Sequence, residues 1–174
     1  MVSLIDITKA YHFTAMKHVN QRRKGVAAEP YINHLTEVAE LVAVATRGED
    51  IDLIMAAVLH DTIEDTATTM EELASTFGLR VAELVAEVTD DKSLPKPERK
   101  RRQIERAAHA SPRAKMIKIA DKVSNLRALG SSPPAGWSRK RIEEYVAWAT
   151  QVVAGCRGVN AWLEREFDKA TKLV

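Results

Sequence analysis

Apolar residues repeat every three to four positions over most of the chain, and no stretch alternates steadily between apolar and polar residues. This spacing is typical of amphipathic helices and not of half-buried strands. The clearest examples are residues 31–42 and residues 51–60, and the second of these is apolar on nearly every side. A helix that is apolar all round belongs at the centre of a domain. The pattern therefore predicts an all-α protein with residues 51–60 in its core.

Helix start and stop signals divide the remaining sequence. Thr69 and Glu72 have the spacing of a capping box, and Gly78 follows as a stop signal. Ser111 before Pro112 is a typical N-cap and first helical residue. Other helices are expected around residues 13–19, 81–88, 112–129 (closed by Gly130), 138–148 and after 158. The sequence shows no repeat and no change in composition, so we expect one domain over residues 1–174.

The bulk composition suits a globular protein in a reducing compartment. Of the 174 residues, 45% are hydrophobic and 29% are charged, which are ordinary values. No apolar run reaches the roughly 18 residues that a membrane span needs, and the N-terminus does not resemble a signal peptide. Cys156 is the only cysteine and cannot form an internal disulfide. We expect a cytoplasmic protein without a membrane partner.

Basic residues gather in two places although the net charge is only +2. One cluster is residues 22–24, and the other contains six basic residues between Lys96 and Arg106. Such runs are usually solvated faces of helices. A small anionic ligand is the alternative interpretation. Nucleic-acid binding is the weakest one, because the chain lacks a nucleic-acid motif and a large excess of positive charge.

The segment from His60 to Asp65 contains four groups that can ionise or bind a metal, and it follows directly on the apolar segment. Neighbouring side chains on a helix diverge by about 100°, so His60 and Asp61 can share a target only near a helix end or a distorted turn. One alternative is a helix end with acidic surface residues and a histidine in the core. The other is a cleft whose floor carries polar groups.

Two distant residues favour the cleft. His34 and Asp121 each lie among apolar neighbours, and an unpaired buried carboxylate is costly. Lys118 or Lys122 could pair with Asp121 at the surface. A cation shared by His34, His60, Asp61 and Asp121 would satisfy all four groups together. Imidazole and carboxylate ligands suit manganese, iron or zinc better than calcium, and the absence of thiolate ligands argues against structural zinc.

The order His34, His60-Asp61, Asp121 resembles the HD phosphohydrolase superfamily, which has an all-helical bundle fold. The chain is more closely similar to the hydrolase domain of the RelA/SpoT family, and within it to the stand-alone small alarmone hydrolases. Several separate motifs in the right order make this resemblance specific. The segments that carry it are Arg22–Lys24, Pro30–His34, Leu59–Thr66, Val88–Lys92 and Ile119–Arg127.

The resemblance implies an activity and a cofactor. These enzymes remove pyrophosphate from the 3′ position of guanosine tetraphosphate and pentaphosphate, using Mn²⁺. Their bifunctional relatives carry a synthetase domain after the hydrolase, for which this chain is too short, so we expect degradation alone. The small nucleotide is the expected partner, and nothing in the sequence indicates an oligomeric state.

The resemblance also implies roles for individual residues. The manganese ligands are matched by His34, His60, Asp61 and Asp121, and the catalytic acidic pair by Glu64 and Asp65. Arg23 matches a position that stacks on guanine, and Asn125, one turn beyond Asp121, matches a nucleotide contact. The remaining substrate positions are matched by Lys24, Lys96, Arg141 and Tyr145.

Two alternatives remain open for the function. The same metal centre could act on another nucleotide, such as NADPH, because an HD fold does not by itself determine the substrate. A nucleotide sensor with a degenerate site is disfavoured, because every expected metal ligand and acidic residue is present.

Overall fold

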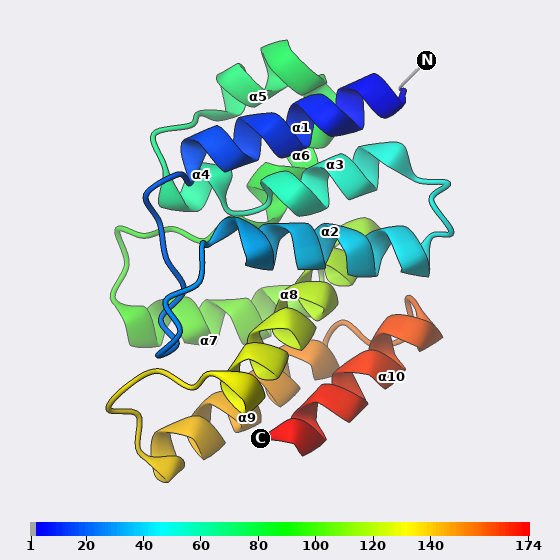
Figure 1. Cartoon of the computed structure of the whole chain (residues 1–174). Coiled ribbons are helices and arrows are strands. Elements are labelled where there is room, and N and C mark those ends of the chain that lie inside the picture. Colours follow the sequence, from blue (N-terminus) through cyan, green and yellow to red (C-terminus); the bar gives the residue numbers. More distant parts are fainter. Residues whose placement is uncertain (1–2) are drawn as a thin grey trace.

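The computed structural model describes residues 3–174, and each regular element in that range is a helix, as the sequence pattern predicts (Figure 1). Two isolated β-bridges, between Arg22 and Pro30 and between Gly25 and Pro134, occur in the loops. The elements are α1 (Leu4–Lys17), α2 (Ile32–Ala45), α3 (Ile51–Leu59), α4 (Thr62–Asp65), α5 (Met70–Phe77), α6 (Leu79–Val88), α7 (Lys96–Ala107), α8 (Pro112–Ser131), α9 (Arg139–Ala154), α10 (Ala161–Ala170) and the 3₁₀ helix η1 (Thr171–Leu173).

Helix α3 is the centre of the upper half of the molecule, as its apolar sequence predicts. Each of its residues from Asp52 to Leu59 is buried. It packs against α1, α2 and α6, and Figure 1 shows it between α1 and α2. Asp52, its one buried acidic residue, pairs with Arg80 of α6 at 3.0 Å. The central position of α3 fixes the place where its polar continuation, His60 and Asp61, emerges.

Helix α8 connects the two halves of the bundle by packing against α2, α6, α9 and α10. Ser111 caps it, with its hydroxyl accepting a hydrogen bond from the amide of Ala114, and Pro112 follows as expected. The prediction that Gly130 ends this helix is wrong, because α8 continues to Ser131. A Cβ at position 130 would lie 2.9 Å from the carbonyl oxygen of Leu173. Glycine here allows close packing of the C-terminal segment and does not terminate the helix.

The first helix is present, but it lies earlier in the chain than its apolar residues suggest. It begins at Leu4 after the capping box of Ser3 and Asp6 and ends at Lys17. The helix expected around residues 13–19 is based on Phe13, Met16 and Val19. Of these, Met16 and Val19 are 60% and 58% exposed, so they do not mark its buried face. A long loop then leads to α2, and its bridge to Pro134 brings it against the end of α8.

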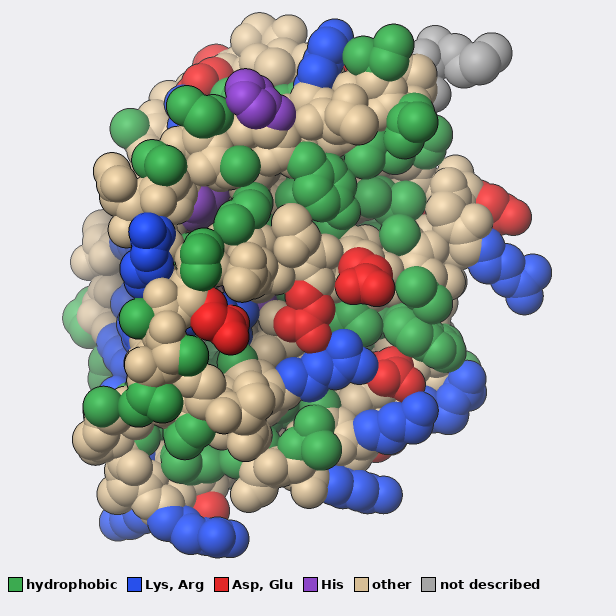
Figure 2. Space-filling view, viewed as in Figure 1, with side chains coloured by type: hydrophobic (Ala, Val, Ile, Leu, Met, Phe, Trp, Pro, Cys, Tyr) green, Lys and Arg blue, Asp and Glu red, His purple; other side chains and the backbone are tan. Residues whose placement is uncertain are grey.

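The basic run from residue 96 forms α7, which packs against α9. Part of it is the solvated face that such runs usually form, since Arg101 and Arg102 pair with Glu98 on the same helix. Basic and acidic side chains are also interspersed on the face seen in Figure 2. Among residues 3–174, no helix is both long enough and apolar enough to cross a bilayer.

Candidate active site

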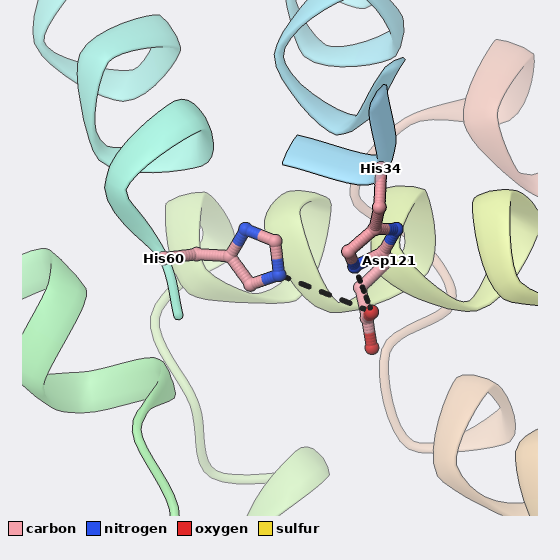
Figure 3. Close-up of side chains that lie close together, drawn as sticks. All are labelled: His34, His60 and Asp121. Atoms are coloured by element: carbon pink, nitrogen blue, oxygen red, sulfur yellow. Dashed lines mark ion pairs between the residues drawn. The ribbon is translucent and has the colours of Figure 1, made fainter. Parts of the chain in front are cut away.

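Helices α2, α3 and α8 bring two histidines and an aspartate together. His34 comes from the first turn of α2, His60 directly follows α3, and Asp121 comes from the middle of α8 (Figure 3). One ligand atom from each residue lies within 4.8 Å of the other two. Nε2 of His34 is 3.2 Å from Oδ1 of Asp121, and Nε2 of His60 is 3.9 Å from the same oxygen. These atoms point toward a common centre.

Both histidines are oriented by hydrogen bonds on the far side of their rings. Nδ1 of His60 lies 2.8 Å from the carbonyl oxygen of Ala57, and Nδ1 of His34 lies 2.8 Å from the hydroxyl of Ser124. A carbonyl can only accept, so His60 carries its proton on Nδ1 and its Nε2 can face a ligand. Nε2 of His60 is buried without a hydrogen-bond partner. The polar atoms near it are carboxylate oxygens of Asp61 and Asp121, at 3.3 Å and 3.9 Å, and a shared cation would satisfy the nitrogen and the oxygens together.

The electrostatics of the cluster favour a cation. Burial alone would lower the pKa of His60, but the carboxylates of Asp61 and Asp121 outweigh it and raise the pKa to about 9. Burial would raise the pKa of Asp121, yet the charge of Lys122 holds it well below its ordinary range. Burial is the main cause that lowers the pKa of His34, which keeps that imidazole neutral. The site therefore combines ionised carboxylates with imidazole nitrogens that a shared cation can bridge. This donor set fits a divalent metal ion such as manganese, iron or zinc.

Asp61 lies beside the cluster in the turn between α3 and α4, where the sequence places it. Its Oδ2 is 3.3 Å from Nε2 of His60 and 3.9 Å from Nε2 of His34. The same oxygen accepts a hydrogen bond of 2.5 Å from the hydroxyl of Tyr31. Burial and the Asp61 carboxylate raise the pKa of Tyr31 far above its ordinary value, so this hydroxyl remains a donor. Its place next to both imidazoles agrees with a fourth ligand, which stays a prediction.

The acidic pair on α4 occupies two different environments. The backbone amide of Asp90 donates to Oε2 of Glu64 at 3.0 Å, and burial followed by the charge of Asp61 raises the pKa of Glu64 to about 7. Asp65 instead pairs with Lys92 and accepts a 2.7 Å hydrogen bond from the Gln21 side chain. Glu64 is thus able to exchange a proton near neutral pH, whereas both oxygens of Asp65 are already engaged.

The cluster lies in a cleft of about 1070 Å³. All the residues that the sequence analysis assigned to the substrate line this cleft, so the structure brings the complete predicted set together. Arg23 also donates to the Asn125 side chain at 3.2 Å, and Asn125 donates to Oδ1 of Asp121 at 2.7 Å. The residues that the sequence resemblance assigns to the substrate, and that line the cleft, are Arg23, Lys24, Lys96, Asn125, Arg141 and Tyr145.

Comparisons with known proteins agree with this geometry. Residues 10–150 match the HD domain family. The guanosine-3′,5′-bis(diphosphate) 3′-pyrophosphohydrolase MESH1 of Homo sapiens is 51% identical over 167 residues, which cover 96% of this chain and 93% of the relative. The protein of the same name from Danio rerio is 50% identical over 163 residues, or 94% and 91% of the two chains. This chain belongs to the MESH1-type HD-domain family.

A solved structure places the likeness at the level of the whole fold. That structure is of a metazoan orthologue of SpoT, which is described as hydrolysing ppGpp and as playing a role in starvation responses. Its TM-score is 0.93 at 44% sequence identity, and the match covers 99% of this chain and 97% of that one. The resemblance to the HD and RelA/SpoT proteins that the motifs indicated is confirmed.

The cleft of this MESH1-type protein also contains a residue, Lys122, whose buried position the sequence did not predict. Lys122 pairs with Oδ2 of Asp121 at 2.7 Å, as the simpler interpretation of Asp121 proposed, but it does so while 7% exposed and not on the surface. Its Nζ lies 4.6 Å from the ring centre of Trp148, which Lys100 also approaches at 4.6 Å. The ion pair and the metal site are therefore compatible, because each uses a different oxygen of Asp121.

Helix α7 contributes basic side chains to one wall of the cleft. Lys96, Arg99 and Lys100 all line the cleft, three of the six basic residues in that run. Burial, followed by the charges of Arg141 and Lys24, lowers the pKa of Lys96 below its ordinary value. Like charges from α7, α9 and the loop before α2 are thus held near one another. An anionic ligand would relieve their repulsion.

Proposed function

We propose that this chain removes pyrophosphate from the 3′ position of guanosine 3′,5′-bis(diphosphate) and of its 5′-triphosphate analogue, leaving GDP or GTP. We also propose that residues 1–174 act as one hydrolase domain with Mn²⁺ as the cofactor. The observation that carries the proposal is the convergence of His34, His60 and Asp121 at the floor of a cleft with basic walls. Relatives that are 50–51% identical over nearly the whole chain are named for this activity, which supports the proposal.

The metal would be held by His34, His60 and Asp121, with Asp61 as the fourth protein ligand. A divalent cation at such a site supplies Lewis-acid polarisation of a phosphoryl oxygen and lowers the pKa of water. The protein's part is to fix the donors. The Nδ1 bond of His60 to Ala57 orients one ligand, and the Lys122 ion pair directs the other oxygen of Asp121 toward the imidazoles.

Glu64 is the proposed proton acceptor for the attacking water. Its pKa of about 7 places its proton exchange near neutral pH, which is the range where a general base is most effective. A cation nearby would favour its ionised form, which is the form a base requires. Asp65, held by Lys92 and Gln21, is proposed to keep its charge in place and to orient the water.

The basic walls are proposed to balance the phosphate charges that one cation cannot neutralise. Lys96, Arg141 and Lys24 bring positive charge from three separate elements to the same cleft. Arg23 would stack its planar guanidinium on guanine, and Asn125 would contact the nucleoside. The 3′-diphosphate would then lie toward the metal centre, because Asn125 and Asp121 are hydrogen-bonded neighbours on α8.

A nucleotide panel tests the proposal. The pure protein is incubated with Mn²⁺ and, separately, guanosine tetraphosphate, guanosine pentaphosphate, NADPH, GTP and ATP, and the products are separated by ion-exchange chromatography. We expect pyrophosphate with GDP or GTP from the first two. Asp121→Asn is the matched control, which should remain folded, lose bound manganese by elemental analysis and lose activity. Cleavage of NADPH without cleavage of either alarmone would refute the substrate assignment and leave the metal site standing.

A further inference from the structure

His34 is supported by a chain of side chains that extends away from the metal centre. Its Nδ1 lies 2.8 Å from Oγ of Ser124, and the Ser124 hydroxyl donates to Oε2 of Glu37 at 2.7 Å. The other carboxylate oxygen of Glu37 accepts from Arg127 at 3.0 Å, and Arg127 also donates to Glu166 of α10 at 2.8 Å. Hydrogen bonds thus connect a candidate ligand on α2 to the C-terminal helix.

The protons in this series of hydrogen bonds can be placed in only one way. A carboxylate paired with arginine can only accept, so the single hydroxyl proton of Ser124 is directed to Glu37. Oγ of Ser124 must then accept from His34, which puts the imidazole proton on Nδ1. Nε2 is left with a free lone pair, and it is the atom 3.2 Å from Asp121. The donor-to-acceptor direction of these hydrogen bonds therefore selects the tautomer of His34 that can bind a metal.

Burial makes this arrangement rigid. His34 is 2% exposed and Ser124 is fully buried, so water cannot replace the hydroxyl between the imidazole and the carboxylate. His60 reaches the same tautomer through the backbone carbonyl of Ala57, whereas His34 depends entirely on side chains. The support of His34 can consequently be removed by substitution without altering the main chain.

We propose that Ser124 and Glu37 are positioning residues for the metal ligand His34, with Ser124 transmitting the negative charge of Glu37 to the imidazole. Arg127 of α8 holds Glu37 in place and connects these hydrogen bonds to Glu166 of α10. This inference rests on the metal site of the proposed function and not on the identity of the nucleotide. Partners of this kind typically contribute about 10- to 100-fold to metal affinity.

The test is metal affinity measured without nucleotide. Metal-free protein is titrated with Mn²⁺ against a fluorescent chelator, and unfolding is measured in parallel in EDTA. Ser124→Ala should weaken Mn²⁺ binding about 10- to 100-fold while the metal-free protein stays folded. Thr46→Val is the matched control: it removes a hydroxyl that bonds to Val42 at the far end of α2, and it should keep wild-type affinity. Wild-type affinity in Ser124→Ala would overturn the inference.

A double-mutant cycle tests whether Glu37 acts on His34 through Ser124 or whether the two residues affect metal binding independently. Glu37→Gln keeps an oxygen that can accept from Ser124 but removes the charge, so its loss of affinity should be smaller than that of Ser124→Ala. The double variant should bind Mn²⁺ no more weakly than Ser124→Ala alone, because both changes interrupt one path. Additive losses would refute transmission through Ser124. Wild-type protein that binds no Mn²⁺ would overturn the inference together with the metal site, whereas metal binding without alarmone cleavage would refute only the substrate proposal.

Discussion

Glu64→Gln should stabilise the metal-free protein while it removes a proposed catalytic group. The Glu64 side chain is 19% exposed, and burial together with the charge of Asp61 raises its pKa from an ordinary 4.5 to about 7. Folding therefore favours the protonated form. Glutamine imitates that form at every pH, and its side-chain oxygen can still accept from the amide of Asp90.

The magnitude follows from proton linkage. The stability associated with protonated Glu64 is fully present below pH 4.5 and is lost as the pH rises through 7, because the unfolded chain releases this proton first. A shift from 4.5 to about 7, at about 1.36 kcal/mol per unit, corresponds to about 3 kcal/mol. The advantage of glutamine should be about 1 kcal/mol at pH 5 and should approach about 3 kcal/mol above pH 8.

The assay is urea unfolding in EDTA at several values between pH 5 and pH 8.5, which gives the free energy of unfolding at each pH. Glu83→Gln, an exposed change on α6, controls for the loss of one negative charge. Saturating Mn²⁺ should shrink the advantage of glutamine, because a cation beside Glu64 favours the ionised carboxylate. A Glu64→Gln protein that is no more stable than wild type at pH 8 in EDTA would refute this account.

Three further predictions concern turnover and recognition. Glu64→Gln combined with Asp65→Asn should still bind Mn²⁺ and nucleotide but turn over on the order of 10²- to 10⁴-fold more slowly in single-turnover assays. Unchanged turnover at saturating substrate would remove both residues from the mechanism. Arg23→Lys should raise KM for guanosine tetraphosphate, since a stacked contact contributes about 1–3 kcal/mol and lysine cannot reproduce it. Lys24→Ala should become less harmful as salt increases, and equal salt dependence of the two variants would contradict the stacking role.

The helices could be predicted because burial imposes a local period on the sequence. α3 is buried from Asp52 to Leu59, as its apolar run requires, and Ser111 caps α8 as its position before proline indicates. The prediction that Gly130 ends α8 was wrong because this glycine is required by a contact that is distant in the sequence. Gly130 has the sequence position of a helix stop, but its missing side chain makes room for Leu173, which lies 43 positions later.

The candidate ligands could be predicted because a carboxylate and two histidines in apolar surroundings need a shared partner. Their support could not be predicted by the same reasoning. Ser124 meets Glu37 across 87 positions, and a serine or a glutamate on a helix carries no signal that it will face another helix. From the sequence, pairing of Lys122 with Asp121 at the surface is an alternative to a shared cation, whereas in the structure one oxygen of Asp121 faces Lys122 and the other faces the imidazoles.

Helix α8 carries Asp121 and Asn125 one turn apart, at a rise of about 6 Å along its axis. Because both residues belong to one helix packed on several sides, this spacing does not change when the surrounding loops move. Under the proposed function, one residue marks the reacting phosphate and the other marks the nucleoside. The helix backbone would then set a fixed distance between the position of the reacting phosphate and that of the nucleoside. Under the same proposal, a ligand with a longer spacer between these two groups could not occupy both positions, so ligand length would be selected in addition to ligand charge.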